Sequence, residues 1–266
     1  MNKILTRSSL SAALLAGVLA VASPALAGQT PPQPPSSVGV ATTVALPSDV
    51  ANATFTNQYG VTRSLSQLKG KTVFLVPFLS LCGDTCPFTS GDLLQLQARL
   101  TKDKATNDVV IGIDVDPYRD SVARLKAYST MIGATFELWT PTGATTTPNG
   151  AAGTGDVNAN LSALSSLLGW SVQVVAEDTP AMTDWMKPYK KLTYDINHSD
   201  GFWVIDKQQI VRFASGNLPA FTGTIAKALS KFMGQKSNIY KNVNKGGWTP
   251  TQALGALAWV TGVNLK

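Results

Sequence analysis

The sequence predicts an α/β fold in which a central sheet is flanked by helices. Two continuous apolar runs, at residues 71–76 and 109–115, have the pattern of strands buried on both faces. Each run is followed by a segment with helical periodicity, at residues 90–100 and 121–132. Because strands that alternate with helices pair in parallel through helical crossovers, we expect the two apolar runs to share one sheet.

The first strand and the first helix flank a loop that holds both cysteines of the chain. The strand is expected to end near Pro77, since proline cannot donate a hydrogen bond to a neighbouring strand. The helix at residues 90–100 is expected to begin with a capping box formed by Thr89 and Asp92. Its buried face carries Leu93, Leu96 and Leu100.

The second strand leads into a helix at residues 121–132, with Asp120 as the expected N-cap and Gly133 at the C-terminal end. A helix follows at residues 161–168 and a strand at residues 170–175. Residues 201–214 are expected to form a hairpin that turns at residues 206–209, and residues 222–233 a final helix. A parallel pair of strands followed by a hairpin and a closing helix is the thioredoxin-like arrangement.

The N-terminal 27 residues have the layout of a secretory signal peptide. Lys3 and Arg7 give a basic start, an apolar run follows at residues 10–22, and Ala25-Leu-Ala27 matches a cleavage site. The alternative is an uncleaved membrane anchor, but the apolar run is shorter than the roughly 20 residues that a spanning helix needs. We expect an exported protein, soluble after cleavage, in a bacterial periplasm.

The rest of the chain is expected to form one domain with additions. Residues 28–50 have the Pro-, Ser- and Thr-rich composition of a flexible leader, and residues 51–234 are the expected thioredoxin-like domain. The segment at 142–155 is interpreted as a surface insertion, and residues 235–266 as a basic extension. The apolar part of that extension, residues 253–263, is expected either to pack on the domain or to dock on a partner or on lipid headgroups.

Composition excludes some classes of function. The chain is 44% hydrophobic and 14% charged, which is typical of a globular domain and not of a nucleic-acid-binding protein. Its formal charge of +6 falls to about +4 when Lys3 and Arg7 are removed with the signal peptide. This mild excess of basic groups permits contact with acidic partners or membrane surfaces without requiring either.

The two cysteines, Cys82 and Cys86, are the only ones in the chain. In an exported protein such a pair normally forms a disulfide. However, the stabilisation by a disulfide grows with the loop that it closes, and this loop is very short. A C-x-x-x-C loop suits two sulfurs that act together on a metal or on another thiol, although a purely structural bridge remains an alternative.

The single histidine, His198, precedes the predicted hairpin. In a thioredoxin-like fold that connection lies beside the loop after the first buried strand, so the imidazole and both sulfurs can converge at one edge of the sheet. Soft thiolates favour Cu(I), and an imidazole completes a three-coordinate site or a tetragonal site for Cu(II). Pro87 suits the first position of a helix, which would place Cys86 where the helix dipole stabilises a thiolate. Zinc is less suited, because structural zinc sites normally have four protein ligands.

These motifs resemble those of the Sco (SenC) family of copper chaperones. The loop CGDTCP at residues 82–87 is similar to the C-x-x-x-C-P loop of that family, and DPYRD at residues 116–120 is similar to its D-P-x-R-D motif. His198 stands ahead of a short apolar strand that ends in Asp206, as the ligand histidine does in the family. The resemblance covers about residues 52–234. Leu81 and Gly83 depart from it.

The resemblance implies a thioredoxin-like fold and one bound copper ion, Cu(I) or Cu(II), with Cys82, Cys86 and His198 as ligands. It further implies copper delivery to the binuclear copper centre of a cytochrome oxidase, or reduction of the cysteines there. The partners would then be the copper-accepting oxidase subunit and a thiol reductant protein. Asp84, Asp114 and Asp116 would shape the loop or a docking surface. For Asp116 and Asp120, we favour simpler roles at a strand end and a helix cap.

Three other functions remain open at this point. A metal-independent thiol–disulfide oxidoreductase would use Cys82 and Cys86 as its redox pair, although dedicated enzymes of this fold have two intervening residues and need no distant histidine. A peroxidase of the same fold would place a threonine shortly before its reactive cysteine, and residues 78–81 contain none. A non-catalytic domain with a structural disulfide is the last alternative.

Overall fold

The structure is a computed structural model that describes residues 30–83, 85–143, 153–154, 158–177, 182–220 and 247–266. Its centre is an eight-stranded sheet with the strand order β1-β13-β12-β4-β5-β6-β2-β3. The strands of this sheet are β1 (Val40–Ala45), β2 (Phe55–Asn57), β3 (Thr62–Arg63), β4 (Thr72–Phe78), β5 (Asp108–Asp114), β6 (Glu137–Pro141), β12 (Phe202–Ile205) and β13 (Ile210–Ser215).

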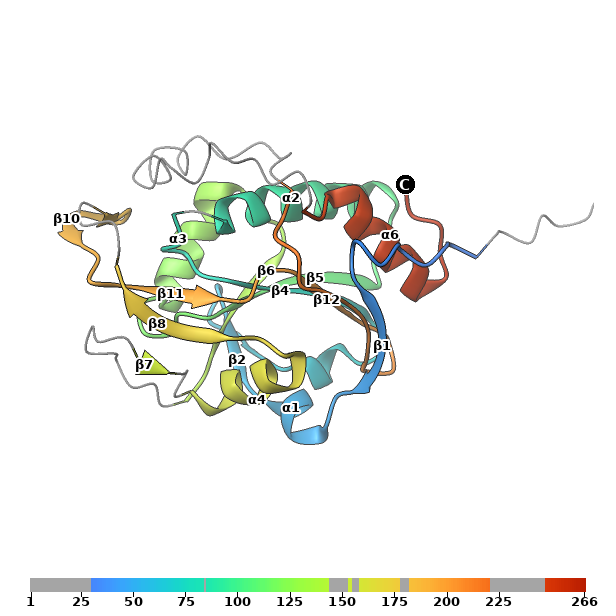
Figure 1. The fold of residues 1–266 in the computed structure, drawn as a ribbon, viewed down its shortest axis with the longest axis horizontal. Helices are drawn as coiled ribbons and strands as arrows, with labels where there is room; N and C mark the ends of the chain where they lie inside the picture. The colour runs from blue at the N-terminus through green and yellow to red at the C-terminus, as the bar shows by residue number, and fades with distance from the viewer. Residues whose placement is uncertain (1–29, 84, 144–152, 155–157, 178–181, 221–246) are drawn as a thin grey trace, which may run out of the picture.

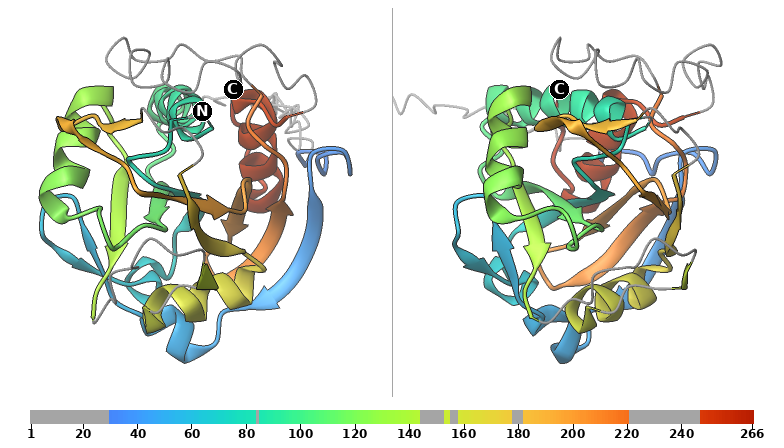
Figure 2. Two further views of the ribbon diagram at one scale, coloured as in Figure 1. Left: turned by 60° about the vertical axis from the view of Figure 1, so that its left-hand side comes forward. Right: turned by 90° about the vertical axis from the view of Figure 1, so that its left-hand side faces the viewer.

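Helices cover both faces of this sheet. Figure 1 and Figure 2 show α2 and α6 on one face and α1 with α4 on the opposite face. The described helices are α1 (Ser48–Asn52), α2 (Cys86–Lys102), α3 (Val122–Ile132), α4 (Ala159–Leu168) and α6 (Pro250–Thr261), with a 3-10 turn, η1, at Leu65–Leu68. The predicted α/β fold, with a central sheet and flanking helices, is confirmed.

The centre of the sheet has the predicted parallel order. β4 pairs in parallel with β5 from Thr72↔Asp108 to Phe78↔Asp114, and β5 pairs in parallel with β6. The β12–β13 hairpin joins the other side of β4 in antiparallel orientation, with Trp203 opposite Leu75. A parallel pair extended by an antiparallel hairpin is the thioredoxin-like arrangement expected from the sequence. The carboxyl ends of β4 and β5 therefore meet at one edge, and the cysteine loop begins there.

The first strand does not end before Pro77. It runs on to Phe78, and Pro77 lies opposite Ile113 of β5. The Val115 amide donates to the Phe78 carbonyl, so Phe78 bonds to β5 and the nitrogen of Pro77 faces the β12 side. Pairing with β12 extends only as far as Leu75. The missing N–H of Pro77 therefore removes no bond from either ladder.

Two predicted helix starts are also wrong. Helix α2 begins at Cys86 with Pro87 in its first turn, so Thr89 and Asp92 lie inside the helix and form no capping box. The α2 start confirms the interpretation that Cys86 lies at a helix N-terminus. Helix α3 is capped by Ser121, whose hydroxyl accepts from the Arg124 amide, and not by Asp120.

The segment expected to be a flexible leader contributes ordered elements over its second half. β1 pairs antiparallel with β13, and α1 begins at Ser48. Val38 and Val50 are buried in the main hydrophobic core. The expectation failed because β1 has no alternating apolar pattern, and because its partner strand is far away in the sequence, with Val40 paired to Ala214. Residues 1–27, the predicted signal peptide, lie outside the described residues.

The C-terminal extension packs back on the domain through α6. This helix begins at the capping box of Thr249 and Gln252, and it contacts α2, β4, β12 and β13. Its apolar side chains are buried against the sheet: Ala253, Leu254, Ala256, Leu257 and Ala258. Of the two expected uses of this apolar segment, packing on the domain is the one observed. The predicted helix at 222–233 lies outside the described residues.

Two small sheets lie outside the central sheet, and β8 in one of them is the strand predicted at residues 170–175. One has the strands β7 (Gly153–Thr154), β8 (Val172–Ala176) and β11 (Tyr194–His198), and the other is a hairpin of β9 (Thr183–Asp184) and β10 (Lys187–Lys191). Both lie near the end of the molecule where β4 and β5 terminate (Figure 1). Most of the predicted insertion at 142–155 lies outside the described residues.

Candidate metal centre

The cysteine loop connects the end of β4 to the start of α2. Cys82 is 7% exposed and Cys86 is 1% exposed, and no disulfide joins the two. The Cys86 amide donates a hydrogen bond to the Cys82 sulfur across 3.3 Å, so this sulfur takes the place of a helix-capping side chain. The loop therefore holds the two sulfurs together at the N-terminus of α2, where the helix dipole favours a negative charge.

His198 comes to the same place from the end of β11. Its Nε2 lies 3.7 Å from the Cys86 sulfur, although the two residues are 112 positions apart in the chain. Its Nδ1 lies 2.8 Å from the Ser199 carbonyl oxygen, to which it donates. A hydrogen bond at Nδ1 fixes the ring orientation and, in the neutral imidazole, leaves the lone pair on Nε2. Nε2 therefore faces Cys86 as a ligand nitrogen would.

Gly201 fixes the path of the chain from His198 into β12. Its φ is +115°, a region that side chains with a Cβ rarely adopt. A Cβ at this position would lie 1.8 Å from the Ser215 carbonyl oxygen. Glycine is thus needed both for the backbone conformation and for the close approach of β13.

The sulfur and the imidazole shift the pKa of each other in opposite directions. Burial raises the pKa of Cys86, but the interactions with Cys82 and His198 lower it more, to about 7. Burial lowers the pKa of His198, whereas the hydrogen bond and the charge of Cys86 raise it to about 9. The two groups therefore favour the charged form of each other, which lowers the pKa of the Cys86 thiol and raises the pKa of the His198 imidazole.

This pairing predicts that alkylation of Cys86 in the metal-free protein follows a titration with a midpoint near pH 7, because only the thiolate reacts. The rate of iodoacetamide labelling at Cys86, followed by peptide mass spectrometry, measures this midpoint. In a His198→Ala variant the midpoint should move to higher pH, since the positive partner is lost. An unchanged midpoint in that variant would show that His198 does not contribute to the shift.

Cys82 is the third expected metal ligand, and the structure brings it only partly into position. Its sulfur lies near the Cys86 amide and 4.0 Å from the Thr85 hydroxyl. Over the described parts of the chain, no three or more His, Cys, Asp and Glu side chains are arranged as a finished metal site. The structure thus places Cys86 and His198 together, with Cys82 beside them. Asp84, in the middle of the loop, lies outside the described residues.

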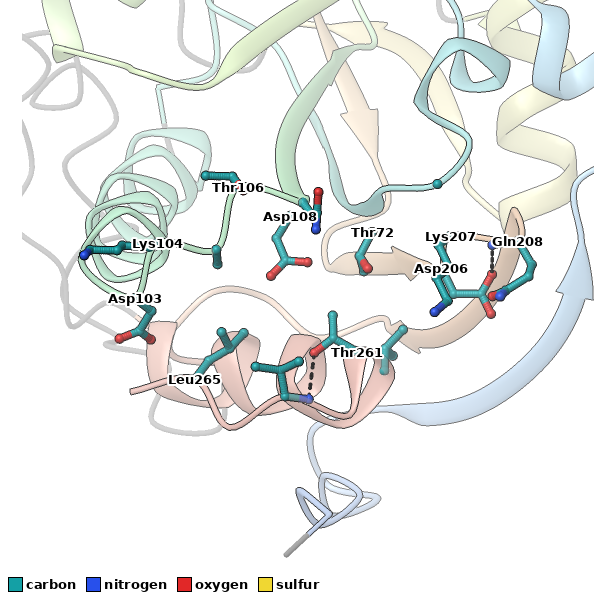
Figure 3. A pocket seen from close by; sticks show the side chains of 15 residues that line it. Thr72, Asp103, Lys104, Thr106, Asp108, Asp206, Lys207, Gln208, Thr261 and Leu265 are labelled. Atoms are coloured by element: carbon teal, nitrogen blue, oxygen red, sulfur yellow. Dashed lines mark hydrogen bonds between the residues drawn. The ribbon is translucent and has the colours of Figure 1, made fainter. Parts of the chain in front are cut away.

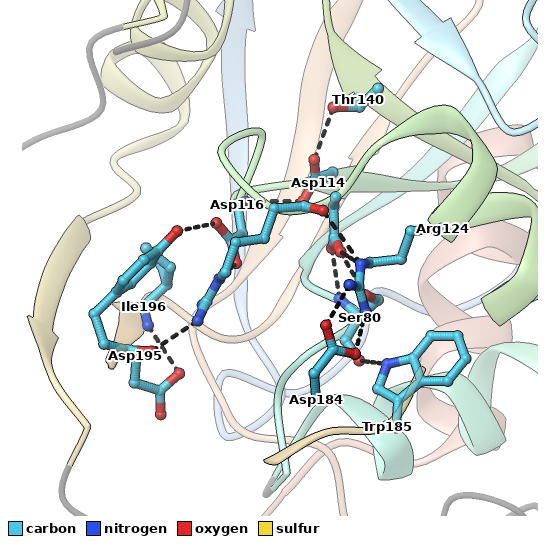
Figure 4. A network of polar contacts seen from close by, with 12 residues as sticks. Ser80, Asp114, Asp116, Arg124, Thr140, Asp184, Trp185, Asp195 and Ile196 are labelled. Carbon is cyan, nitrogen blue, oxygen red and sulfur yellow. Dashed lines mark hydrogen bonds and ion pairs between the residues drawn. The ribbon is translucent and has the colours of Figure 1, made fainter. Parts of the chain in front are cut away.

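Asp114 and Asp116, at and just after the end of β5, lie inside the protein and not on the surface. Asp114 and Asp116 are fully buried, which rules out a docking surface for them (Figure 4). Asp114 accepts from the Asp116 amide and from the Thr140 hydroxyl, and Asp116 is paired with Arg119. Burial raises the pKa of Asp114 well above its usual value, with the charges of Asp120 and Asp116 adding to the effect.

Asp120 takes part in a contact that the sequence did not predict. Its carboxylate accepts from both the amide and the hydroxyl of Ser80, two residues before Cys82. Arg124 lies next to Asp120 and forms a bidentate ion pair with Asp184. Trp185 then donates from its indole nitrogen to the Ser80 carbonyl. Nothing in the local sequence around residues 184 and 185 indicated this contact with the loop.

A separate cavity of about 380 Å³ lies at the opposite end of the central strands. Its walls include Thr72 and Asp108, the first residues of β4 and β5, together with Leu265 (Figure 3). β4 has seven residues, and at about 3.3 Å each this separates the cavity from the cysteine loop by roughly 20 Å. The cavity therefore belongs to another part of the molecule and has no part in the chemistry of the sulfurs.

The comparison with protein families agrees with the motifs. Residues 48–154 match the SCO1/SenC family. The SCO1 protein homolog of Bacillus subtilis (strain 168) is 36% identical over 94 residues, which are 34% of this chain and 47% of that protein. The chain thus matches about half the length of this relative. The resemblance stated from the sequence is confirmed over residues 48–154, which include both cysteines but not His198.

Solved structures of similar proteins share low sequence identity with this chain. Bradyrhizobium japonicum ScoI with copper bound is 19% identical, with a TM-score of 0.48 over 71% of this chain and 97% of that one. Yeast Sco1 with copper bound is 18% identical, with a TM-score of 0.46 over 77% and 92% of the two chains.

Within the described parts of our chain, we find no helix with the length and apolarity to cross a bilayer.

Proposed function

We propose that this protein is a copper metallochaperone that holds one copper ion through Cys82, Cys86 and His198. The observation that supports this most strongly is the approach of His198 Nε2 to the Cys86 sulfur, within 3.7 Å. The SCO1/SenC match over residues 48–154 supports it independently. The solved structures with a similar fold include copper-bound Sco proteins.

The donor set fits copper better than it fits other metals. Two thiolates and an imidazole suit Cu(I) in three-coordination, and the same ligands with added water or carboxylate oxygen suit Cu(II). The pKa of Cys86 is lowered to about 7, so little free energy is needed to prepare its thiolate for the metal. A change of side-chain rotamer at Cys82 would bring its sulfur from the Cys86 amide to the metal.

We further propose that the protein acts outside the cytoplasm and passes its copper to the binuclear copper centre of a cytochrome oxidase. With three strong ligands the ion keeps a free side for an incoming thiolate of the recipient. Transfer then proceeds by ligand exchange, in which one sulfur of the recipient binds as one ligand of the donor leaves. The predicted signal peptide supports the location, and the family match supports the recipient.

A titration of the reduced, metal-free protein with Cu(I) against a coloured chelator tests this function. We expect one equivalent to bind, with an affinity at least tenfold lower in His198→Ala and stoichiometric binding lost in Cys86→Ser. Asn197→Ala, which changes the exposed neighbour of His198 on β11, is the matched control and should leave the affinity unchanged. Failure of the wild-type protein to compete for Cu(I) would contradict the proposal.

A thiol–disulfide oxidoreductase is a second candidate, and the low pKa of Cys86 favours it. In this reaction the Cys86 thiolate attacks a disulfide of the partner, and Cys82 then attacks the mixed disulfide. The protein ends with a Cys82–Cys86 disulfide and the partner with two thiols. Rapid reduction of the partner by the metal-free protein, unchanged in His198→Ala apart from its pH midpoint, would favour this candidate over copper delivery.

A further inference from the structure

We propose that Trp185 and Asp120 are positioning residues that hold the cysteine loop in place through Ser80. The inference deepens the proposed function, on which its copper readout rests, but its redox readout does not depend on copper. Ser80 is fully buried and lies between the end of β4 and Cys82. Whatever fixes the backbone of Ser80 therefore fixes the direction in which the chain enters the loop.

Ser80 is held at both of its backbone hydrogen-bonding groups. The Asp120 carboxylate accepts from the Ser80 amide at 2.7 Å and also from its hydroxyl. On the other side, the Trp185 indole nitrogen donates to the Ser80 carbonyl at 2.8 Å. Figure 4 shows Asp184 and Trp185 approaching Ser80 from a different segment than the helix that carries Arg124. These contacts come from the side chains of two distant segments and so fix the peptide plane on each side of Ser80.

The two holding side chains are themselves fixed by Arg124. Its guanidinium lies 3.8 Å from the Asp120 carboxylate and bonds both oxygens of Asp184, the residue before Trp185. The Trp185 ring packs 6.1 Å from the Tyr128 ring, centroid to centroid, on the same helix as Arg124. Arg124 therefore contacts Asp120, which bonds to the Ser80 amide, and also Asp184, which precedes the Trp185 that bonds to the Ser80 carbonyl. Through these contacts the β9–β10 hairpin is attached to the cysteine loop.

The effect on function follows from ordering the loop before the metal or disulfide forms. A loop held in one conformation keeps the two sulfurs near each other, which raises their effective concentration for a shared metal and for mutual disulfide formation. Loss of one buried hydrogen bond weakens such ordering by roughly three- to tenfold. Both equilibria should therefore weaken together when Ser80 is released.

The test compares Trp185→Phe, which removes the indole N–H and keeps an aromatic ring, with Asp120→Asn, which keeps the side-chain shape. Two quantities are measured: the Cu(I) affinity, and the equilibrium constant for Cys82–Cys86 disulfide formation in glutathione buffers. In each variant we expect both to fall by roughly three- to tenfold. Trp248→Phe is the matched control, because the buried Trp248 indole nitrogen has no hydrogen-bond partner. It should leave both quantities unchanged even if it lowers the melting temperature.

The outcomes separate this proposal from the proposed function. A disulfide equilibrium that is unchanged in both Trp185→Phe and Asp120→Asn overturns the positioning role, whatever copper does. An equal fall in Trp248→Phe also overturns it, since the effect would then be one of general stability. If the wild-type protein binds no Cu(I) but the disulfide equilibrium falls as expected, copper delivery is wrong and the positioning role stands.

Discussion

Replacing Asp92 with asparagine is expected to stabilise the protein by an amount that grows as the pH rises from about 4 to about 8. Asp92 lies inside α2 and is fully buried, and neither of its carboxylate oxygens has a hydrogen-bond partner. Burial raises its pKa from 3.8 to about 8. A neutral side chain of the same shape removes the cost of ionising this group inside the protein.

The sign of the pH effect follows from the two pKa values. Between about pH 4 and 8 the folded protein keeps a proton on Asp92 that the unfolded chain releases. The folded state is therefore favoured below this range and loses stability through it, at up to about 1.4 kcal/mol per pH unit. Asp108, whose pKa burial raises to about 6, acts in the same direction over the lower part of the range in both proteins.

Urea unfolding at pH 5, 7 and 9 measures the effect. The stability of the Asp92→Asn variant should fall less steeply with pH than that of the wild-type protein, and the difference should be largest at pH 9. Asp49→Asn, on the exposed side of α1, is the control and should follow the wild-type curve. Parallel curves for the wild type and Asp92→Asn would contradict the burial of an unpaired carboxyl group.

Replacing Asp184 with alanine is expected to destabilise the protein by about 3–5 kcal/mol, because it leaves the Arg124 guanidinium buried without its main partner. The two side chains are only 9% and 5% exposed, and two hydrogen bonds join them. Asp184 also anchors the β9–β10 hairpin, so its loss removes packing as well as charge. Urea unfolding at pH 7 measures the change.

The double variant Arg124→Met/Asp184→Leu tests whether the loss of stability in Asp184→Ala comes from the unpaired charge of Arg124 or from lost packing at residue 184. Replacing both partners by apolar side chains of similar size removes both charges of this pair, so part of the stability should return. The return is incomplete because Asp120 loses Arg124 as its neighbour. The half-exposed pair of Arg63 and Glu137, with 32% and 29% exposure, is the control. Arg63→Gln should cost about 1 kcal/mol or less. Equal costs at the two pairs would contradict the importance of burial at Asp184.

The sequence predicted those elements whose pattern is decided locally. β5 and α3 have the buried run and the helical face that the pattern predicted, and Gly133 ends α3 in the left-handed conformation. The periodic apolar pattern placed the start of α2 too late, at residue 90, whereas Pro87 correctly placed Cys86 at a helix N-terminus. β1 was missed because its pairing with β13 joins residues as far apart as Val40 and Ala214.

The same distinction applies to the candidate site. Cys82, Cys86 and His198 could be proposed from the sequence because cysteine and histidine are rare in this chain and each lies next to a recognisable motif. The residues that hold the loop were not identified. Asp120 was expected only to cap a helix, and its contact with Ser80, 40 residues away, was not predicted. Trp185 lies 105 residues from Ser80 and in no recognised motif. Only the folded chain shows that they meet.

X-ray absorption at the copper edge of the Cu(I)-loaded wild-type protein, beside His198→Ala, tests the central claim most directly. We predict a first shell of two sulfurs and one nitrogen in the wild-type protein, from Cys82, Cys86 and the His198 Nε2 that faces Cys86. The variant should keep the sulfurs and lose the imidazole nitrogen. A shell with no histidine nitrogen in the wild-type protein, or an identical spectrum in the variant, would contradict the proposed copper site.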